Sequence, residues 1–103
     1  MKIVVITGST RGIGYGLAQA FLERGCAVVV SGRAPGRVET AVKALADQYG
    51  LDRVLGQACD VSQYEQVQAL WGASVKRYGR VDIWVNNAGV SHGQSSLFSH
   101  YPQ

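Results

Sequence analysis

Short, mostly apolar runs alternate along this chain with longer segments in which apolar residues recur every three or four positions. A continuous apolar run is typical of a parallel strand buried on both faces, and the longer spacing is typical of an amphipathic helix. The sequence therefore predicts four strands that alternate with three helices. The expected strands are residues 2–7, 27–31, 54–58 and 81–85, and the expected helices are residues 12–24, 38–49 and 62–78.

The helix ends carry local signals of their own. A glycine follows each helix, where a left-handed residue commonly ends helical structure. Ser62 and Glu65 have the spacing of a capping box, so we expect the third helix to begin at Ser62. A turn over residues 32–36 is expected before the second helix. The glycines are Gly25, Gly50 and Gly79.

Apolar positions on the helices predict which side chains pack against the sheet. The aromatic side chains among them are expected in the core and not in a substrate pocket. The positions expected to be buried are Ile13, Leu17, Ala20, Phe21, Leu22, Val38, Ala41, Val42, Leu45, Tyr49, Val67, Leu70, Trp71, Val75 and Tyr78.

The alternation of strands and helices also predicts the topology. Strand–helix–strand crossovers are right-handed by rule and build a parallel sheet. The expected fold class is α/β: the amino-terminal half of a Rossmann-type doubly wound parallel sheet, with strand order 3-2-1-4 and helices on both faces. No composition shift or internal repeat divides the chain, so residues 1–103 are expected to form one domain.

Residues 7–14, with the sequence Thr-Gly-Ser-Thr-Arg-Gly-Ile-Gly, join the first strand to the first helix. Glycine permits close approach of a ligand and positive φ angles. The N–H groups at a helix start lack intrahelical partners, so a pyrophosphate is a natural ligand there. The glycine spacing differs from G-x-G-x-x-G, and a tight turn without a ligand remains an alternative on this segment alone.

Other polar segments follow the remaining strands, at residues 31–33, 60–61 and 86–89. The carboxyl ends of parallel strands lie at one edge of a sheet, and ligands bind there, at the point where the strand order reverses. We therefore expect these three segments and the turn at residues 7–14 to form one crevice.

Residues 7–14 together with Asn-Asn-Ala-Gly at residues 86–89 resemble the short-chain dehydrogenase/reductase family. The resemblance covers the whole chain and implies hydride transfer between a nicotinamide cofactor and a carbonyl or alcohol. The opening segment and residues 82–89 are also similar to the chlorophyll b reductase branch of that family, whereas generic carbonyl reduction is the default expectation.

The resemblance also implies roles for individual residues. Asp60 would accept a hydrogen bond from the adenine amine, although it could instead serve the helix start beside Ser62. Asn86 would tie the strand ends together, and Asn87 would line the ribose side of the cofactor. The expected cofactor-binding residues are Gly8, Ser9, Thr10, Arg11, Gly12, Ile13, Gly14, Arg33, Asp60, Val61, Asn87, Ala88 and Gly89.

The end of the second strand indicates the type of cofactor. An acidic residue there would favour a ribose 2′-hydroxyl, but this chain has Gly32 and then Arg33. A guanidinium matches a phosphate, and Arg11 lies in the glycine turn. We therefore expect NADP (NADPH), with a solvated Arg33 in the turn as the alternative.

The family carries its chemistry on a serine and on a Tyr-x-x-x-Lys pair further along. Tyr101 has only two residues after it, so neither element is expected here and no catalytic residue is assigned. The chain is interpreted as a cofactor-binding half that stops before the catalytic segment. It is either part of an NADP-dependent oxidoreductase or a non-catalytic nucleotide-binding module or inert fragment. His92 and His100 are expected in a loop.

Composition excludes several classes of partner. The net charge is +3, but the ten Lys and Arg residues are scattered, so no nucleic acid is expected. No window approaches the roughly 18 apolar residues of a membrane span, and the first strand begins too early for a signal peptide, which favours the cytoplasm. Cys26 and Cys59 fall at opposite strand ends and are expected to stay reduced, and no metal site is expected. The complete protein is expected to be a homo-oligomer with a small-molecule substrate.

Overall fold

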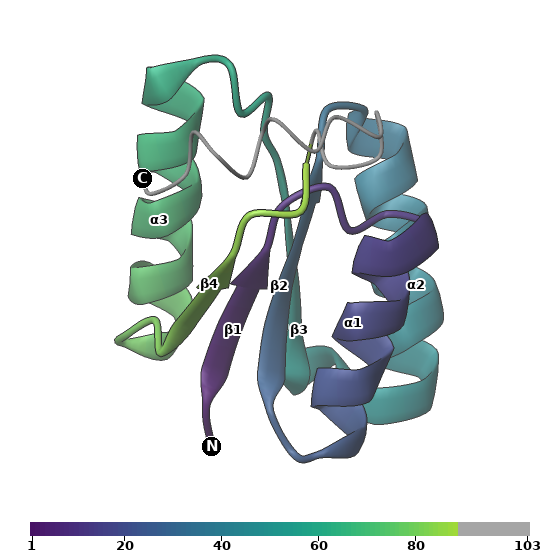
Figure 1. The fold of residues 1–103 in the computed structure, drawn as a ribbon. Coiled ribbons are helices and arrows are strands. Elements are labelled where there is room, and N and C mark those ends of the chain that lie inside the picture. The colour runs from purple at the N-terminus through teal and green to yellow at the C-terminus, as the bar shows by residue number, and fades with distance from the viewer. Residues whose placement is uncertain (89–103) are drawn as a thin grey trace.

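The computed structural model describes residues 1–88 of the chain. It confirms the α/β fold: a parallel sheet in the order β3-β2-β1-β4 lies between helices (Figure 1). A short 3₁₀ helix, η1, covers Leu51–Arg53. The strands are β1 Ile3–Ile6, β2 Ala27–Gly32, β3 Val54–Ala58 and β4 Ile83–Val85, and the helices are α1 Gly12–Glu23, α2 Pro35–Tyr49 and α3 Tyr64–Tyr78.

Two layers of helices cover the two faces of the sheet. Helices α1 and α2 lie on one face and α3 lies on the other (Figure 1). Val4 and Ile6 of β1 pack under α1 and α2, whereas Val5 belongs to a second cluster with Leu70 of α3. Side chains alternate between the faces of a strand, so one continuous apolar run supplies both cores.

The starts of two helices differ from the expectation. Helix α2 begins at Pro35, inside the predicted turn. Proline has no backbone N–H, but the N–H of the first helical residue has no hydrogen-bond partner within the helix, so proline is well tolerated there. The predicted capping box is wrong: α3 begins at Tyr64. The N–H and hydroxyl of Ser62 instead donate to Asp60 Oδ1, at 2.9 and 2.7 Å.

Two side chains that were expected in the core lie at the surface. Ile13 is 72% exposed and Trp71 is 50% exposed. On α1, the small residues Gly14 and Ala18 face the sheet instead, because the glycine turn brings the start of this helix very close to the strands. Trp71 packs beside the ring of Trp84 on β4, with 6.0 Å between ring centroids.

The described residues include both cysteines of the chain. Cys26 and Cys59 are both free, and burial raises the pKa of the Cys59 thiol. Within residues 1–88, no helix has the length and apolar character that a membrane span requires. The same part of the chain contains no cluster of His, Cys, Asp and Glu able to hold a metal ion.

Candidate functional site

The segments that follow the strands meet at one edge of the sheet, at the top of Figure 1. Backbone hydrogen bonds join them: Thr7 N–H donates to Val85 O at 3.0 Å, and Ser9 N–H donates to Ser31 O at 2.8 Å. Cys59 N–H, one residue before Asp60, donates to the Gly32 carbonyl at 2.8 Å. The convergence predicted from the strand order is therefore present.

Glycines shape the turn between β1 and α1. Gly8 and Gly12 have positive φ angles of 60° and 62°, which side chains disfavour. A Cβ on Gly14 would lie 2.6 Å from Asn87 Nδ2 and would also collide with the Gly8 carbonyl oxygen. The backbone of α1 can therefore start directly against the end of β4 only because position 14 is glycine.

Two buried hydroxyls hold the turn in place. Ser9 has no exposed surface; its Oγ donates to Ile6 O at 2.7 Å and accepts from Ser31 N–H at 3.0 Å. Thr7 Oγ1 accepts from the N–H groups of Asn87 and Ala88, both at 3.0 Å. Thr7 was not among the residues predicted from the sequence to form the site. The only signal was a hydroxyl residue directly before the first glycine.

Of the two asparagines after β4, Asn87 and not Asn86 ties the strand end to the glycine turn. Asn87 Nδ2 donates to Gly8 O at 2.9 Å and so ties β4 to the glycine turn. Asn86 is exposed, and its Oδ1 accepts from Trp84 Nε1 at 2.8 Å. Side chains alternate along an extended segment, so Asn86 shares the side of Trp84 and Asn87 faces the turn. The assignment of the tie to Asn86 is therefore wrong.

Asp60 forms a small turn after β3 and does not cap α3. Hydrogen bonds from the Ser62 hydroxyl and then the Ser62 N–H lower the pKa of this carboxyl, and nearby Arg33 acts in the same direction. Both bonds reach Oδ1, so Oδ2 has no hydrogen-bond partner within residues 1–88. Val61 is 43% exposed beside it. An ionised carboxylate next to an exposed apolar side chain can accept from an amine on a flat ring.

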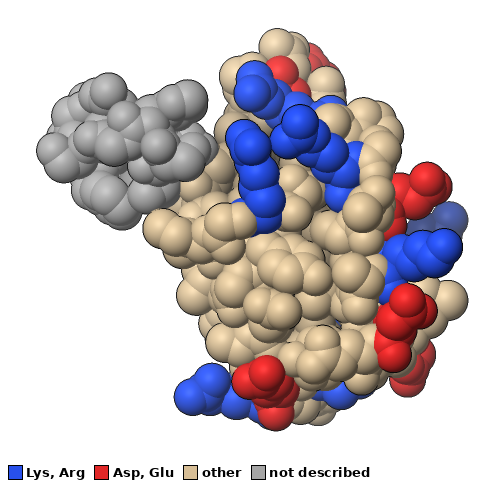
Figure 2. Space-filling view, turned by 90° about the vertical axis from the view of Figure 1, so that its right-hand side faces the viewer, with Lys and Arg blue, Asp and Glu red and all other residues tan. Residues whose placement is uncertain are grey.

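Basic side chains gather at the same end of the molecule. Figure 2 shows a group of Lys and Arg side chains at the upper end of the face covered by α1 and α2. Arg11 and Arg33 are both exposed. Arg11 takes the position before α1 but makes no side-chain bond that caps the helix. These guanidinium groups are placed to meet an anion at the crevice.

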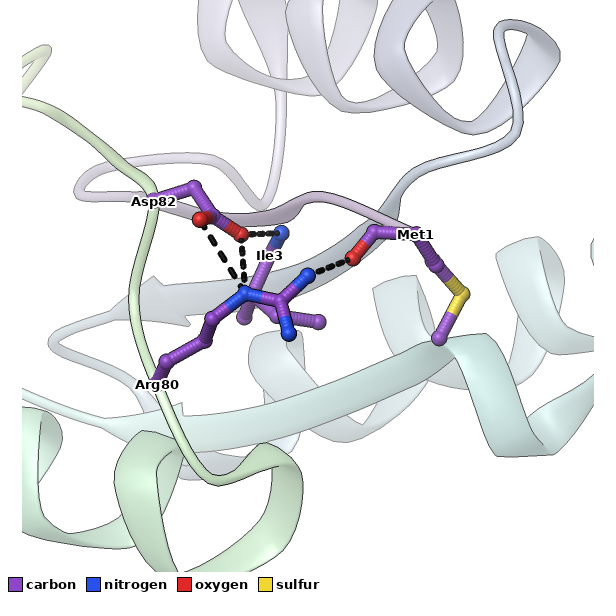
Figure 3. A network of polar contacts seen from close by, with 4 residues as sticks. All are labelled: Met1, Ile3, Arg80 and Asp82. Carbon is purple, nitrogen blue, oxygen red and sulfur yellow. Dashed lines mark hydrogen bonds and ion pairs between the residues drawn. The ribbon is translucent and has the colours of Figure 1, made fainter.

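Asp82 directly precedes β4, at the opposite end of the sheet from the crevice (Figure 3). Its Oδ2 accepts from Ile3 N–H at 2.7 Å and pairs with Arg80 Nε at 3.0 Å, and Arg80 also donates to Met1 O at 2.5 Å. The bond from Ile3, and then the guanidinium of Arg80, lower the pKa of Asp82. This carboxylate stabilises the start of β1 and takes no part in the crevice.

Some predictions fall outside the described residues. Gly89, His92, His100 and Tyr101 lie beyond residue 88. The expected contribution of Gly89 to the ribose side of the site therefore stays a prediction.

Comparisons with known proteins identify relatives of this chain. Residues 2–102 match the model of the short chain dehydrogenase family. The chain is 48% identical over 86 residues to chlorophyll(ide) b reductase NOL, chloroplastic, of Arabidopsis thaliana, covering 84% of this chain and 24% of that protein.

Two solved structures share the fold. L-sorbose reductase from Gluconobacter frateurii, complexed with NADPH and L-sorbose, has a TM-score of 0.81 and 40% identity, over 85% of this chain and 33% of that one. An alcohol dehydrogenase from Thermococcus sibiricus, complexed with 5-hydroxy-NADP, has a TM-score of 0.75 and 34% identity, over 82% and 35%. The family match, the strand order and the glycine turn agree: the chain belongs to the short-chain dehydrogenase family.

Proposed function

We propose that this chain is the cofactor-binding part of an NADP(H)-dependent oxidoreductase that reduces a carbonyl or oxidises an alcohol. The observation that carries the proposal is the glycine turn, which buried hydrogen bonds fix to β2 and to the end of β4. It leaves backbone N–H groups at the start of α1 facing a basic end of the molecule. When bound, the cofactor supplies or accepts the hydride.

The glycine turn and the segments beside it each bind a different part of the cofactor. The backbone of Thr10, Gly12 and Ile13 meets the pyrophosphate at the positive end of the α1 dipole. Gly8 and Gly14 permit the close approach of the cofactor to the backbone, and Ser9 holds the turn against β1 and β2 through its hydroxyl. Asp60 Oδ2 accepts from the adenine amine while Val61 packs on the ring, and Asn87, Ala88 and Gly89 line the ribose side.

The choice of NADP rests on charge at the end of β2. No carboxylate follows Ser31, and Arg33 stands two positions later. Arg11 and Arg33 bind the 2′-phosphate through charge-assisted hydrogen bonds. Both solved relatives described above were crystallised with an NADP-type ligand, which supports this choice.

Residues 1–88 supply binding and orientation, not the proton that the carbonyl oxygen needs. Asp60 lies on the adenine side, and Asp82 lies at the far end of the sheet. The chain spans 24–35% of the three relatives described above, so turnover, a homo-oligomeric assembly and a cytoplasmic location are proposals about the whole protein.

A titration of NADPH against NADH tests the cofactor, and tryptophan fluorescence can follow it because Trp84 is bonded to Asn86 beside the site. We expect NADPH to bind more tightly by about 1.5–3 kcal/mol, the usual contribution of hydrogen bonds to charged groups. Arg33→Gln should remove much of the difference, and Arg24→Gln, at the far end of α1, should not. Equal affinities in the unchanged protein would contradict the proposal.

A second candidate concerns the substrate. The 48% identity to chlorophyll(ide) b reductase favours a substrate of that kind over a generic aldehyde or ketone. The test is NADPH oxidation by the protein expressed from its complete reading frame, with chlorophyllide b and simple carbonyls side by side. Turnover of simple carbonyls alone would reject this candidate. Cofactor binding with no turnover of any of them would favour the non-catalytic module.

A further inference from the structure

A cavity of about 330 Å³ opens between α1 and α2 beside the glycine turn. Thr10 and Arg11 line it from the turn, Tyr15 from α1 and Arg37 from α2. None of the residues that line it is acidic. The groove on the other side of α2, in contrast, contains Glu39. Near its amino end, the helix therefore presents Arg37 toward the turn and Glu39 away from it.

The two arginines of the cavity are not neutralised by the fold. Within residues 1–88 the ion pair between Arg80 and Asp82 is the only one, and it lies at the opposite end of the sheet. Two guanidinium groups that line one cavity without a carboxylate repel each other. An anion between them would relieve this repulsion.

The position of Arg37 on its helix also favours a bound anion. Helix α2 begins at Pro35, so Arg37 lies in its first turn, and this turn contains no acidic residue. The amino end of a helix is positive, so a cation there is unfavourable. The local sequence thus places a charge where helix stability disfavours it. A bound anion would offset that cost.

The cavity is next to the end of β2. A Cβ at Gly32 would lie 2.9 Å from the methyl group of Thr10, so the turn and this strand end are in contact. The ribose of a dinucleotide binds at the end of this strand in folds of this type. Arg33, by comparison, lies near the carboxylate of Asp60.

We propose that Arg37 is a specificity-determining residue that binds a phosphate monoester jointly with Arg11, and that this phosphate is the 2′-phosphate of the cofactor. The inference rests on the proposed use of NADP(H) and extends the phosphate site to α2. Arg37 lines the cavity from α2 and Arg11 lines it from the glycine turn, so two cations are available to the phosphate.

The test uses two probes that differ only in the phosphate, adenosine 2′,5′-bisphosphate and adenosine 5′-monophosphate, with the protein expressed from its complete reading frame. Isothermal calorimetry should show that Arg37→Gln lowers the preference for the bisphosphate about five- to tenfold, as expected for one lost charged contact. Lys43→Gln is the matched control, because Lys43 is exposed on the same helix and lines neither cavity. It should leave the preference unchanged.

A thermal melt without ligand separates binding from folding. Removing a cation from the first turn of α2 should leave the midpoint of Arg37→Gln unchanged or slightly higher, so a loss of preference would not come from unfolding. A preference that survives in Arg37→Gln overturns this inference and leaves the NADP proposal intact. A lack of preference in the unchanged protein refutes both.

Inorganic phosphate forms the third arm of the experiment. It should compete more strongly with the bisphosphate than with the 5′-monophosphate, because only the bisphosphate also uses the cavity between α1 and α2. If Arg37→Gln weakens the binding of inorganic phosphate but leaves the preference for the bisphosphate intact, the cavity holds a separate anion and the inference is wrong.

Discussion

The two ends of the sheet use charged side chains in different ways. At the amino end, Asp82 forms an ion pair with Arg80 and accepts a hydrogen bond from Ile3 N–H, and Arg80 donates to Met1 O (Figure 3). Both charges are therefore paired within the protein. At the carboxyl end, Arg11 and Arg37 line an open cavity that contains no acidic side chain. One end stabilises the chain, and the other keeps its charge available for a ligand.

At the carboxyl end of the sheet, uncharged side chains hold the glycine turn in place. Thr7, Ser9 and Asn87 fix the glycine turn through hydrogen bonds to backbone groups. None of these side chains is charged, so they can be buried without an ion pair. The site is therefore rigid because of neutral hydrogen bonds, while its cations remain at the surface. Three substitutions test this division, in order of decreasing effect.

Gly14→Ala should have the largest effect, because the added Cβ would collide with the Gly8 carbonyl and the Asn87 amide. We expect a loss of about 3 kcal/mol or more in the free energy of unfolding, as in an overpacked core. Urea denaturation measures it, and cofactor affinity should fall at the same time.

Gly16→Ala is the control for that substitution. Gly16 lies on the same helix, and a Cβ there would meet no atom within 4 Å. Its free energy of unfolding should rise by about 0.5–1 kcal/mol, because alanine has a higher helix propensity than glycine. A similar loss in both variants would show that α1 itself is fragile and that close approach to the turn is not the cause.

Asn87→Ala should have a smaller effect. It removes the hydrogen bond to Gly8 O and leaves that carbonyl without its partner, at a cost of about 1–2 kcal/mol. Asn86→Ala, one position earlier and exposed, should change the free energy of unfolding by no more than about 0.5 kcal/mol. Equal losses in the two variants would remove the distinction between the asparagines.

Asp82→Asn tests the amino end and should have the smallest effect, because its ion pair is partly exposed. The pKa of Asp82 is lowered in the folded state from 3.8, its usual value. Its stabilisation is therefore complete above that unfolded-state pKa and is lost as the pH falls through the lower folded-state pKa. Melting midpoints of the unchanged protein should fall over this range more steeply than those of Asp82→Asn. The affinity for NADPH at neutral pH should be the same in both proteins.

The pattern of apolar and polar residues along the chain determined the secondary structure and the topology of this protein. The apolar runs and helical periods predicted each strand and α-helix to within a few residues, but not the short 3₁₀ helix η1. The right-handed crossover rule then gave the strand order, and the strand order predicted where the polar segments meet.

Other features depended on the tertiary structure, because they are set by contacts between distant segments. The sequence could not show that Gly14 faces Asn87, 73 positions away, or that Ile13 is exposed. Nor could it show that Arg37 of α2 shares a cavity with Arg11. Spacing along the chain predicts which face of an element a residue occupies, but the packing of one element on another decides what that face meets.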